Sequence, residues 1–307
     1  MPAQARRHRA RFAKKKGKSK RKWYLVVLIL LIASFSYFFL SSQYWDKDGK
    51  LSVAIWKGNG DVLISTFDPV SKEIANIQIP GETQVEVARK LGTWKLASVW
   101  QLGENEGFSG RLLTETLTYH FKFPVVAWAD SPALGFSGTN LAGLARAVFM
   151  PYKTNLKIAD RFHIAAFALR VANPERVDVN LAETSYLKRA KFIDGGEGYM
   201  IVGTPSPALS SIFADPEISA KATTVIIRDA TGAEGAGEVG RVVEVLGAKV
   251  ASIVKEKADD IDCIVSGKDD SQVRKLASVF SCSIDKGEPD NNFDIEIRLG
   301  LGFARRY

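Results

Sequence analysis

The stretch DVLISTFDPVSKEIANIQIPGET, residues 61–83, decides the fold class of this chain, because it holds two β-rich runs joined by a turn. The second run alternates apolar and polar residues over 74–79 and stops at Pro80-Gly81, directly before Glu82. Proline cannot donate a ladder hydrogen bond, and glycine favours turns. The pattern predicts a strand that ends in a glycine-containing loop with one acidic residue.

The residues around this stretch extend the same pattern into an α/β domain. LSVAIWKGNGDVLISTF, residues 51–67, places two β-rich runs around Gly58-Asn59-Gly60, which is a strong hairpin signal. Downstream, Leu113, Leu117 and Phe121 recur at helical spacing, and NLAGLARAVF and LKIADRFHIAAFALRVA are typical of two more helices. Strands that alternate with helices predict an α/β domain over residues 46–211.

A second, smaller domain is predicted at the C-terminal end. Residues 212–222 are small, polar and proline-containing, which is typical of a linker. Residues 223–307 then alternate strands and helices in a β-α-β-β-α-β pattern, as in a small α/β sandwich. Residues 235–240 match GxGxxG, but the domain is too short for a dinucleotide fold, so we interpret these glycines as a tight turn.

The positive charge of the chain is concentrated in its first residues. Residues 1–22 hold 11 of the 42 Lys and Arg residues and no acid, which leaves 31 basic against 34 acidic residues, a net charge of −3, for the remainder. We interpret this basic tail as a topology signal in which residues 6–22 also contact anionic lipid headgroups. RNA binding by the tail is the weaker alternative, and no nucleic-acid partner is expected for the folded domains.

An uncharged run follows the tail at residues 23–45, WYLVVLILLIASFSYFFLSSQYW. About 20 apolar residues cross a bilayer core, and aromatic residues at both ends are typical of membrane interfaces. The sequence predicts a single-pass transmembrane helix with the tail in the cytoplasm and everything after Tyr44 outside the cell. A cleaved signal peptide and a buried soluble helix are the alternatives.

Two further features bear on chemistry and stability. GFSG occurs twice, at residues 107–110 and 135–138, each time before a predicted helix. We interpret Ser109 and Ser137 as N-caps, although a phosphate site at Ser109 with help from Arg111 is the alternative. Cys263 and Cys282 are the only cysteines. A helix that runs back along its strand would bring them together, so a disulfide and two reduced thiols both remain open.

The order of these features resembles the LytR–CpsA–Psr (LCP) family of cell-envelope proteins. That family has a basic cytoplasmic tail, one transmembrane helix, an extracellular α/β LCP domain and often a LytR C-terminal domain. The resemblance lies in residues 61–87, in GRLLTETLTYHFKFPVVAWAD, and in VIIRDATGAEGAGEVGRVVEVLGAKV with the segments VRKLASVF and DIEIRLGLGF. It implies the fold class α/β, with an N-terminal transmembrane helix, an LCP-like α/β domain and a LytR C-terminal-like domain over residues 223–307.

The resemblance also implies a site. In the family an Arg-x-Asp element and an Ile-Pro-Arg-Asp-Thr element hold a polyprenyl pyrophosphate, and the acid assists metal-dependent transfer of a glycopolymer to peptidoglycan. Here the matching positions are Asn59-Gly60-Asp61 and Ile79-Pro80-Gly81-Glu82-Thr83. The resemblance thus points to Asp61 and Glu82 as catalytic residues, with Asp61 as the Mg²⁺ ligand, whereas both motif arginines are missing. Arg89, Arg111 and Ser109 are the candidates for binding phosphate in their place.

From these features we predict a membrane-anchored, extracytoplasmic cell-envelope protein of the LCP type. Our leading hypothesis is that it binds or scaffolds cell-wall glycan or a polyprenyl-linked glycan, with the bilayer and peptidoglycan as partners and no cofactor. The first alternative is an active phosphotransferase, which would need Mg²⁺. The second is a regulatory or assembly module in cell-wall biogenesis.

Overall fold

The computed structural model describes residues 17–40, 42–45, 49–192, 195–233, 235–287, 289 and 292–307. The chain divides into two compact units, residues 1–42 and 43–307. Residues 1–16, which hold most of the predicted basic tail and of its predicted lipid contacts, lie outside the described residues.

The described residues of the first unit form the helix α2 (Gly17–Leu40). Its described side chains from Trp23 to Ile32 are apolar and mostly more than half exposed. Over the part of the chain that the structure describes, however, no helix has both the length and the apolar character needed to cross a membrane. The anchor at residues 23–45 therefore stays a prediction.

The C-terminal limit of that predicted span is wrong, because residues 43–45 belong to the second unit. The Trp45 side chain is only 2% exposed and packs edge-on against Phe167, with ring centroids 5.3 Å apart. The Tyr44 hydroxyl accepts a hydrogen bond from Asn155 Nδ2 at 3.0 Å. These two aromatic residues are therefore bound to the folded unit and do not form one end of an aromatic belt.

A five-stranded mixed sheet lies at the centre of the first part of the second unit. Its strands are β1 (Leu51–Trp56), β2 (Val62–Asp68), β3 (Glu73–Ile79), β6 (Ala127–Ala129) and β7 (Arg176–Asn180), in the order β6-β1-β2-β3-β7. The first three strands form an antiparallel meander, and β6 and β7 add parallel strands at its two edges. The hairpin predicted from the sequence is the β1–β2 pair. β2 is buried along its whole length, which explains its run of apolar and β-branched residues.

Shorter elements surround this sheet. The small strands β4 (Gln84–Glu86) and β5 (Thr93–Lys95) pair with each other, as do β8 (Leu187–Lys191) and β9 (Glu197–Ile201). The helices and 3₁₀ turns are α3 (Leu96–Asn105), α4 (Arg111–Phe121), η1 (Ser131–Phe136), α5 (Leu141–Phe149), α6 (Ile158–Ala168), η2 (Asn173–Glu175), η3 (Leu181–Glu183) and α7 (Pro207–Phe213).

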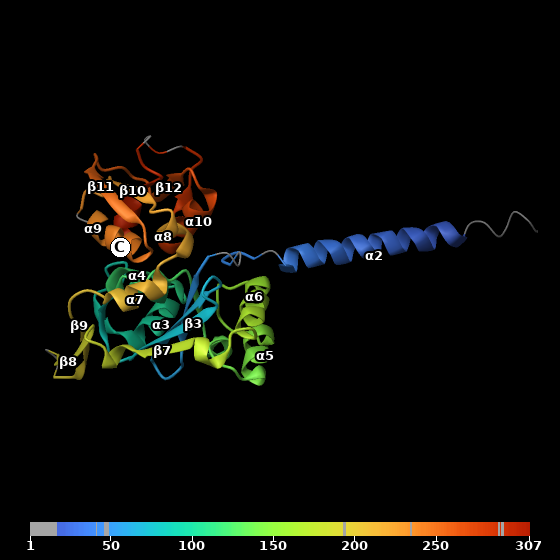
Figure 1. Ribbon diagram of the computed structural model, residues 1–307, viewed down its shortest axis with the longest axis horizontal. Helices are drawn as coiled ribbons and strands as arrows, with labels where there is room; N and C mark the ends of the chain where they lie inside the picture. Colours follow the sequence, from blue (N-terminus) through green and yellow to red (C-terminus); the bar gives the residue numbers. More distant parts are fainter. Residues whose placement is uncertain are drawn as a thin grey trace, which may run out of the picture. The chain divides into compact units, whose positions relative to one another are not determined.

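Helices cover both faces of the five-stranded sheet, so this part has three layers (Figure 1). Successive residues of a strand point to opposite faces, and β2 accordingly supplies both cores. Val62 and Ile64 pack with side chains of α3 and α4, whereas Leu63 and Phe67 pack with those of α5 and α6. The α/β domain predicted from alternating strands and helices is thus a mixed α/β sandwich.

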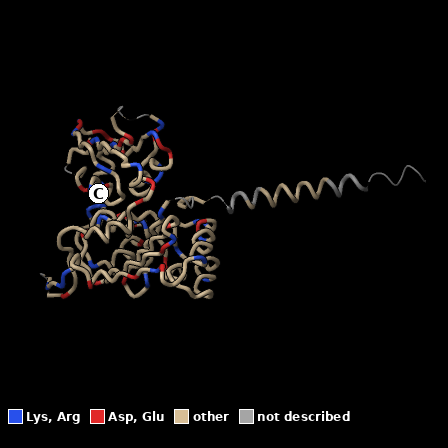
Figure 2. The backbone as a smooth tube through the Cα atoms, in the orientation of Figure 1, with Lys and Arg blue, Asp and Glu red and all other residues tan. Residues whose placement is uncertain are grey.

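The C-terminal part has its own five-stranded sheet, in the order β11-β10-β14-β12-β13. Its elements are β10 (Thr224–Asp229), α9 (Ala236–Val245), β11 (Lys249–Lys255), β12 (Cys263–Gly267), α10 (Asp270–Phe280), β13 (Ser283–Ile284), β14 (Ile295–Leu299) and α11 (Leu301–Arg306). α9 and α10 each bury one apolar stripe against this sheet. Over residues 43–307, basic and acidic residues are interspersed along the backbone, in agreement with the low net charge outside the tail (Figure 2).

The segment 212–222, predicted as a linker, contains the helix α8 (Pro216–Ala220) and is bound to the C-terminal part. Asp215 Oδ1 accepts the N–H groups of Glu217 and Ile218, so it caps this helix. Its Oδ2 lies 2.8 Å from Lys275 Nζ, on α10. The proline that suggested a break in structure stands instead at the first helical position, where its missing N–H costs nothing.

Cys263 and Cys282 form a disulfide, with their Cα atoms 4.9 Å apart. Cys263 begins β12, and Cys282 follows the end of α10, which runs back along that strand. A cross-link over 19 residues restricts the unfolded chain. We expect reducing agent to lower the free energy of unfolding of the C-terminal part by about 3 kcal/mol.

Denaturant unfolding with and without dithiothreitol measures this effect. The double variant Cys263→Ala/Cys282→Ala is the control, since reducing agent should not change its unfolding curve. An equal stability of the wild type in both conditions would contradict a disulfide in the native protein.

Candidate functional site

Asp61 lies at the end of the β1–β2 turn, where N–H donors surround its carboxylate. Its Oδ1 accepts the Gly81 N–H at 2.9 Å, and its Oδ2 accepts Asn59 Nδ2 at 3.2 Å. Gln78 Nε2, on β3, is 3.5 Å from the same Oδ2. The carboxylate therefore ties the β1–β2 turn to the loop after β3, and this local role accounts for the aspartate without any chemistry.

Gly81 occupies the position of the missing motif arginine, and its surroundings leave no room for a side chain. A Cβ added to Gly81 would lie 2.5 Å from the backbone oxygen of Gly60 and 3.0 Å from the Cβ of Ala97. The Gly81 carbonyl also accepts the Ala97 N–H at 2.9 Å, at the start of α3. The space where an arginine side chain would begin is thus filled by the β1–β2 turn and α3.

Glu82, the other predicted catalytic acid, has an exposed side chain. Its backbone oxygen accepts the Tyr199 N–H at 3.4 Å, which attaches the loop to β9. Among the described residues no hydrogen bond or ion pair joins the Glu82 carboxylate to Asp61. The structure does not bring the two acids together, and their catalytic roles stay predictions.

The residues present do not fit the Mg²⁺ ion that the family resemblance implies. The described residues include no group of three or more His, Cys, Asp or Glu side chains that could hold a metal. Around Asp61, the N–H groups of Gly81 and Asn59 point their positive ends at the carboxylate oxygens. A cation at these oxygens would face those same N–H dipoles, whereas Mg²⁺ requires oxygen ligands in octahedral geometry.

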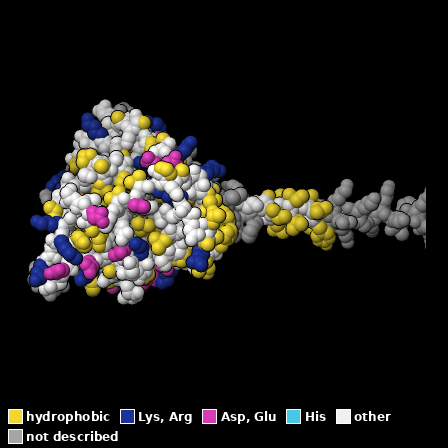
Figure 3. Space-filling view, turned by 60° about the horizontal axis from the view of Figure 1, so that its bottom comes forward, with side chains coloured by type: hydrophobic (Ala, Val, Ile, Leu, Met, Phe, Trp, Pro, Cys, Tyr) yellow, Lys and Arg dark blue, Asp and Glu magenta, His cyan; other side chains and the backbone are white. Residues whose placement is uncertain are grey.

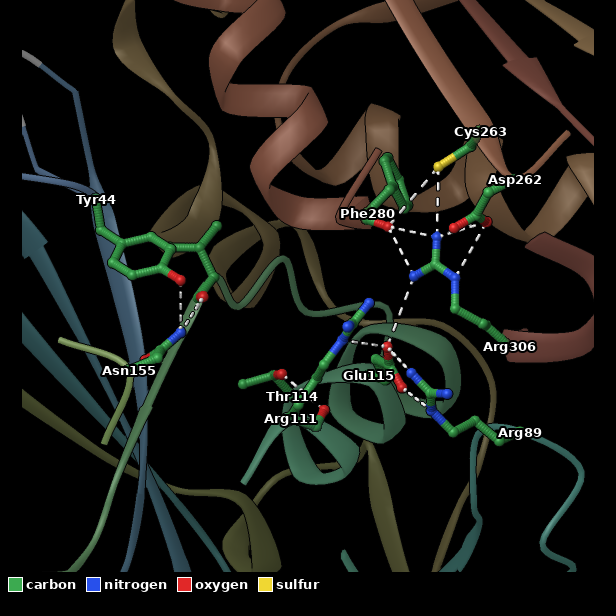
Figure 4. A network of polar contacts seen from close by, with 11 residues as sticks. Tyr44, Arg89, Arg111, Thr114, Glu115, Asn155, Asp262, Cys263, Phe280 and Arg306 are labelled. Carbon is green, nitrogen blue, oxygen red and sulfur yellow. Dashed lines mark hydrogen bonds and ion pairs between the residues drawn. The ribbon is translucent and has the colours of Figure 1, made fainter. Parts of the chain in front are cut away.

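The two arginines predicted to bind phosphate do meet, but on a buried carboxylate of the protein itself (Figure 4). Glu115, on α4, is only 3% exposed. Its Oε2 accepts Arg89 Nε at 2.6 Å, and its Oε1 accepts Arg111 Nε at 2.9 Å. Arg89 adds a second bond, from its Nη2 to Oε1 at 2.8 Å, so this pair is bidentate. Binding of phosphate by these arginines stays a prediction.

A third arginine, Arg306, joins this cluster from the last helix, α11. Its Nη1 lies 3.6 Å from Glu115 Oε1, and its Nη2 lies 2.9 Å from Asp262 Oδ1. The backbone also connects the two parts, because the Arg89 N–H donates to the Arg306 carbonyl at 2.9 Å. Burial, with the nearby Glu115 charge, raises the pKa of the adjacent Tyr307 hydroxyl, so that hydroxyl stays neutral at pH 7.

Sequence reasoning missed both Glu115 and Arg306. Glu115 stands in a helix pattern at an ordinary polar position, and Arg306 lies 191 positions away at the end of the chain. The only signal was the i,i+4 spacing of Arg111 and Glu115, which is common on exposed helix faces. We refer to Glu115, Arg89, Arg111 and Arg306 as the Glu115 cluster.

The predicted N-caps are wrong. α4 begins at Arg111 with Gly110 as its N-cap, and no side chain caps it. Ser109 precedes that position in a left-handed conformation, with φ 51°, so its side chain is not placed to cap the helix. The α5 cap is Asn140, whose Oδ1 accepts the Ala142 N–H, while the Ser137 hydroxyl donates to the Leu134 carbonyl. The phosphate role of Ser109 stays a prediction.

A polar cavity of about 560 Å³ is lined by residues of β3 and β7, among them Gln78, which contacts Asp61. Its polar side chains are Lys57, Asn76, Gln78, Ser137, Asp178, Asn180 and Glu183. We call it the β3–β7 cavity. One cation and two carboxylates line it, so its charge does not favour a pyrophosphate. Amide and carboxylate groups on neighbouring strands do offer donors and acceptors for hydroxyl groups.

His120, at the end of α4, supplies no positive charge either. Burial, together with the charge of the nearby Lys122, lowers its pKa to about 4. The imidazole is therefore neutral at pH 7, as expected for a packing residue.

Comparisons with known proteins give solved structures but no match at the level of sequence. Neither a protein-family model nor a curated protein matches the chain. The similar structures include a LytR-CPS2A-psr family protein, TagT. TagV from B. subtilis has 10% identity and a TM-score of 0.39, over 55% of this chain and 95% of TagV.

TagT is a second similar structure, and it has been solved with bound octaprenyl pyrophosphate lipid. It has 12% identity and a TM-score of 0.37, over 52% of this chain and 87% of that one. TagT bound to LIIa-WTA has 11% identity, the same TM-score of 0.37, and covers 52% of this chain and 88% of TagT. TM-scores below 0.5 do not establish a shared fold, so the residues of this chain have to carry any functional conclusion.

The close packing at Gly81 leads to a prediction. Gly81→Ala places a Cβ against the Gly60 backbone, which cannot move as a side chain can. We expect a loss of about 1–3 kcal/mol in the free energy of unfolding, measured with denaturant.

Gly138→Ala is the matched control, since a Cβ at Gly138 meets no atom within 4 Å. Gly138 also has no positive φ. A Gly81→Ala variant as stable as the Gly138→Ala variant would show that the loop has room for a side chain.

Proposed function

We propose that this chain is a membrane-anchored, extracytoplasmic cell-envelope protein of the LCP type that binds glycan without transferring it. The glycan would belong to the cell wall or to a polyprenyl-linked precursor. The ligand class comes from the family that the sequence resembles, and the anchor is assigned to the apolar run of α2. The single observation that carries the proposal is Gly81, where the matching arginine is absent and its space is filled.

The electrostatics of the site support binding over transfer. Phosphoryl transfer depends on positioning and on cations that stabilise charge on the transferred group. In this chain Arg89 and Arg111 are engaged by Glu115. The β3–β7 cavity holds Lys57 as its one cation, opposite Asp178 and Glu183. A pyrophosphate at this place would meet two carboxylates and one cation, so more negative charge than positive.

The same cavity has the groups that suit a sugar. Gln78 and Asn180, on β3 and β7, line it together with Asp178. The Asn180 amide donates to Glu183 at 2.7 Å and accepts the Ala182 N–H at 3.2 Å, so Gln78 is the amide that can both donate to and accept from the hydroxyl groups of a glycan. Leu63, Leu134 and Val179 supply apolar surface beside them. A pocket with a few polar groups on rigid strands is the usual form of a binding site.

Co-sedimentation of the full-length protein with purified peptidoglycan tests the proposal, with Gln78→Ala as the key variant. Among the described residues, the Gln78 side chain makes one long hydrogen bond, to Asp61 Oδ2 at 3.5 Å. We expect the wild type to bind and Gln78→Ala to bind up to about tenfold more weakly, the size of one lost hydrogen bond. Gln101→Ala, on the exposed side of α3, is the matched control and should bind as the wild type does.

Two outcomes would overturn the proposal. The first is a wild type that stays in the supernatant, or an equal loss in the Gln78→Ala and Gln101→Ala variants. The second is release of phosphate from a polyprenyl pyrophosphate in the presence of Mg²⁺ that Asp61→Asn abolishes, which would establish the phosphotransferase instead.

A further inference from the structure

The helices α5 and α6 are apolar on the side that faces solvent as well as on the side that faces the sheet. On α5 the exposed positions include Leu141, Ala145 and Phe149, which follow each other at i, i+4 and i+8. Leu141 is 68% and Phe149 70% exposed. A surface helix of a soluble protein normally carries polar residues on that side.

α6 and the residue after it repeat this pattern. Phe162, Ala166 and Leu169 are exposed at i, i+4 and i+7. The Phe162 ring contacts Phe149 of α5 edge-on, with centroids 5.5 Å apart, so the two helices share one apolar surface. Figure 3 shows hydrophobic side chains gathered at the edge of the folded unit where Figure 1 places α5 and α6. We call this surface the α5–α6 face.

The charged residues of this segment are almost all basic. Between residues 138 and 172 there are five Lys or Arg residues and one acid, Asp160. Asp160 is fully buried, whereas Arg146, Lys157 and Arg170 are exposed. The α5–α6 face therefore combines exposed large apolar side chains with a rim of positive charge.

The chain that leaves α2 is fixed to this same pair of helices. Asp160 Oδ1, in the first turn of α6, accepts the backbone N–H groups of Gln43 at 3.0 Å and Tyr44 at 3.1 Å. α2 ends at Leu40, only three residues before Gln43. An extended chain covers at most about 3.6 Å per residue, so a connection of three residues can reach no further than roughly 11 Å.

We propose that the α5–α6 face is a docking surface for an anionic lipid bilayer, into whose interface Leu141, Phe149 and Phe162 insert. The inference rests on the proposed function in one respect, the assignment of α2 as the membrane anchor. If α2 spans the bilayer, the short connection holds α6 close to the lipid headgroups. Apolar side chains with flanking Lys and Arg residues are the chemistry of interfacial membrane binding.

The charge of the face favours a bilayer over a second copy of the chain. Two copies that met through this face would bring their basic rims together, which is unfavourable. Anionic headgroups complement the same rim. A cavity of about 450 Å³ nearby, lined by Trp45, Phe167, Lys72 and Arg170, adds to this basic and apolar character.

Nitroxide labels on the full-length protein in liposomes of phosphatidylethanolamine and phosphatidylglycerol test the proposal. Single cysteines are introduced as Phe149→Cys, as Met200→Cys on β9, and as Ile29→Cys on α2, without reducing agent, because the native cysteines are joined. Met200 is 42% exposed, so it is a matched control for an exposed apolar side chain. Accessibility to oxygen and to a water-soluble nickel complex reports the depth of each label.

The Phe149→Cys label is expected to have an oxygen-to-nickel accessibility ratio several-fold above that of the Met200→Cys label. Replacing phosphatidylglycerol by phosphatidylcholine should lower this ratio. The docking surface would be overturned, and the anchor left intact, by one combination of results. In that case the Phe149→Cys label is as accessible to nickel as the Met200→Cys label, while the Ile29→Cys label lies in lipid.

Two further outcomes would reject either the membrane anchor or the bilayer as the occupant of the face. An Ile29→Cys label in water would overturn the anchor of the proposed function, and the Phe149→Cys label still tests the face by itself. Spin–spin broadening at Phe149→Cys that does not depend on the lipid would identify a second copy of the chain as the occupant, against the proposal.

Discussion

The buried carboxylate of Glu115 is the interaction on which the rest of the site depends. Burial of an unpaired charge is costly, and this carboxylate, at 3% exposure, has two arginines in direct contact and a third at 3.6 Å. These arginines come from the loop after β4, from the start of α4 and from α11. The carboxylate therefore joins the two sheets of residues 43–307 through one cluster. A phosphate would need the positive charges of these arginines, and Glu115 already pairs with them inside the protein.

A second constraint is the close packing at the β1–β2 turn, which leaves no room there for an arginine that could bind a phosphate. Asp61 accepts the Gly81 N–H, and Gly81 packs against the Gly60 backbone and Ala97. The turn, the loop after β3 and the start of α3 thus form one tightly packed corner that has no space for a guanidinium group. What stays open beside it is the β3–β7 cavity, whose amides and carboxylates suit hydroxyl groups better than phosphates. This packing at Gly81 and the lining of the cavity are the observations on which the proposal of binding without transfer rests.

Much of the fold followed from local patterns, whereas the site did not. The β1–β2 hairpin, the strand up to Ile79 and the helices α4, α5 and α6 have clear periodicity, and the structure contains all of them. The N-caps at Ser109 and Ser137 were wrong because one or two residues of loop geometry decide a cap. Trp45 was assigned to the membrane because hydrophobicity does not distinguish lipid from a protein core. The Glu115–Arg306 contact spans 191 positions, and no local pattern encodes such a contact.

Calorimetric titration of the full-length protein with inorganic pyrophosphate tests most directly whether Glu115 keeps the arginines of this site from binding a phosphate ligand. We predict no binding by the wild type and salt-dependent binding by Glu115→Gln, in which the neutral amide leaves the charges of Arg89 and Arg111 uncompensated, while Arg306 keeps its contact with Asp262. Circular dichroism of the variant checks that it is folded. Binding of pyrophosphate by the wild type, abolished by Arg111→Gln, would contradict the account, because it would show that these arginines are available to a phosphate ligand.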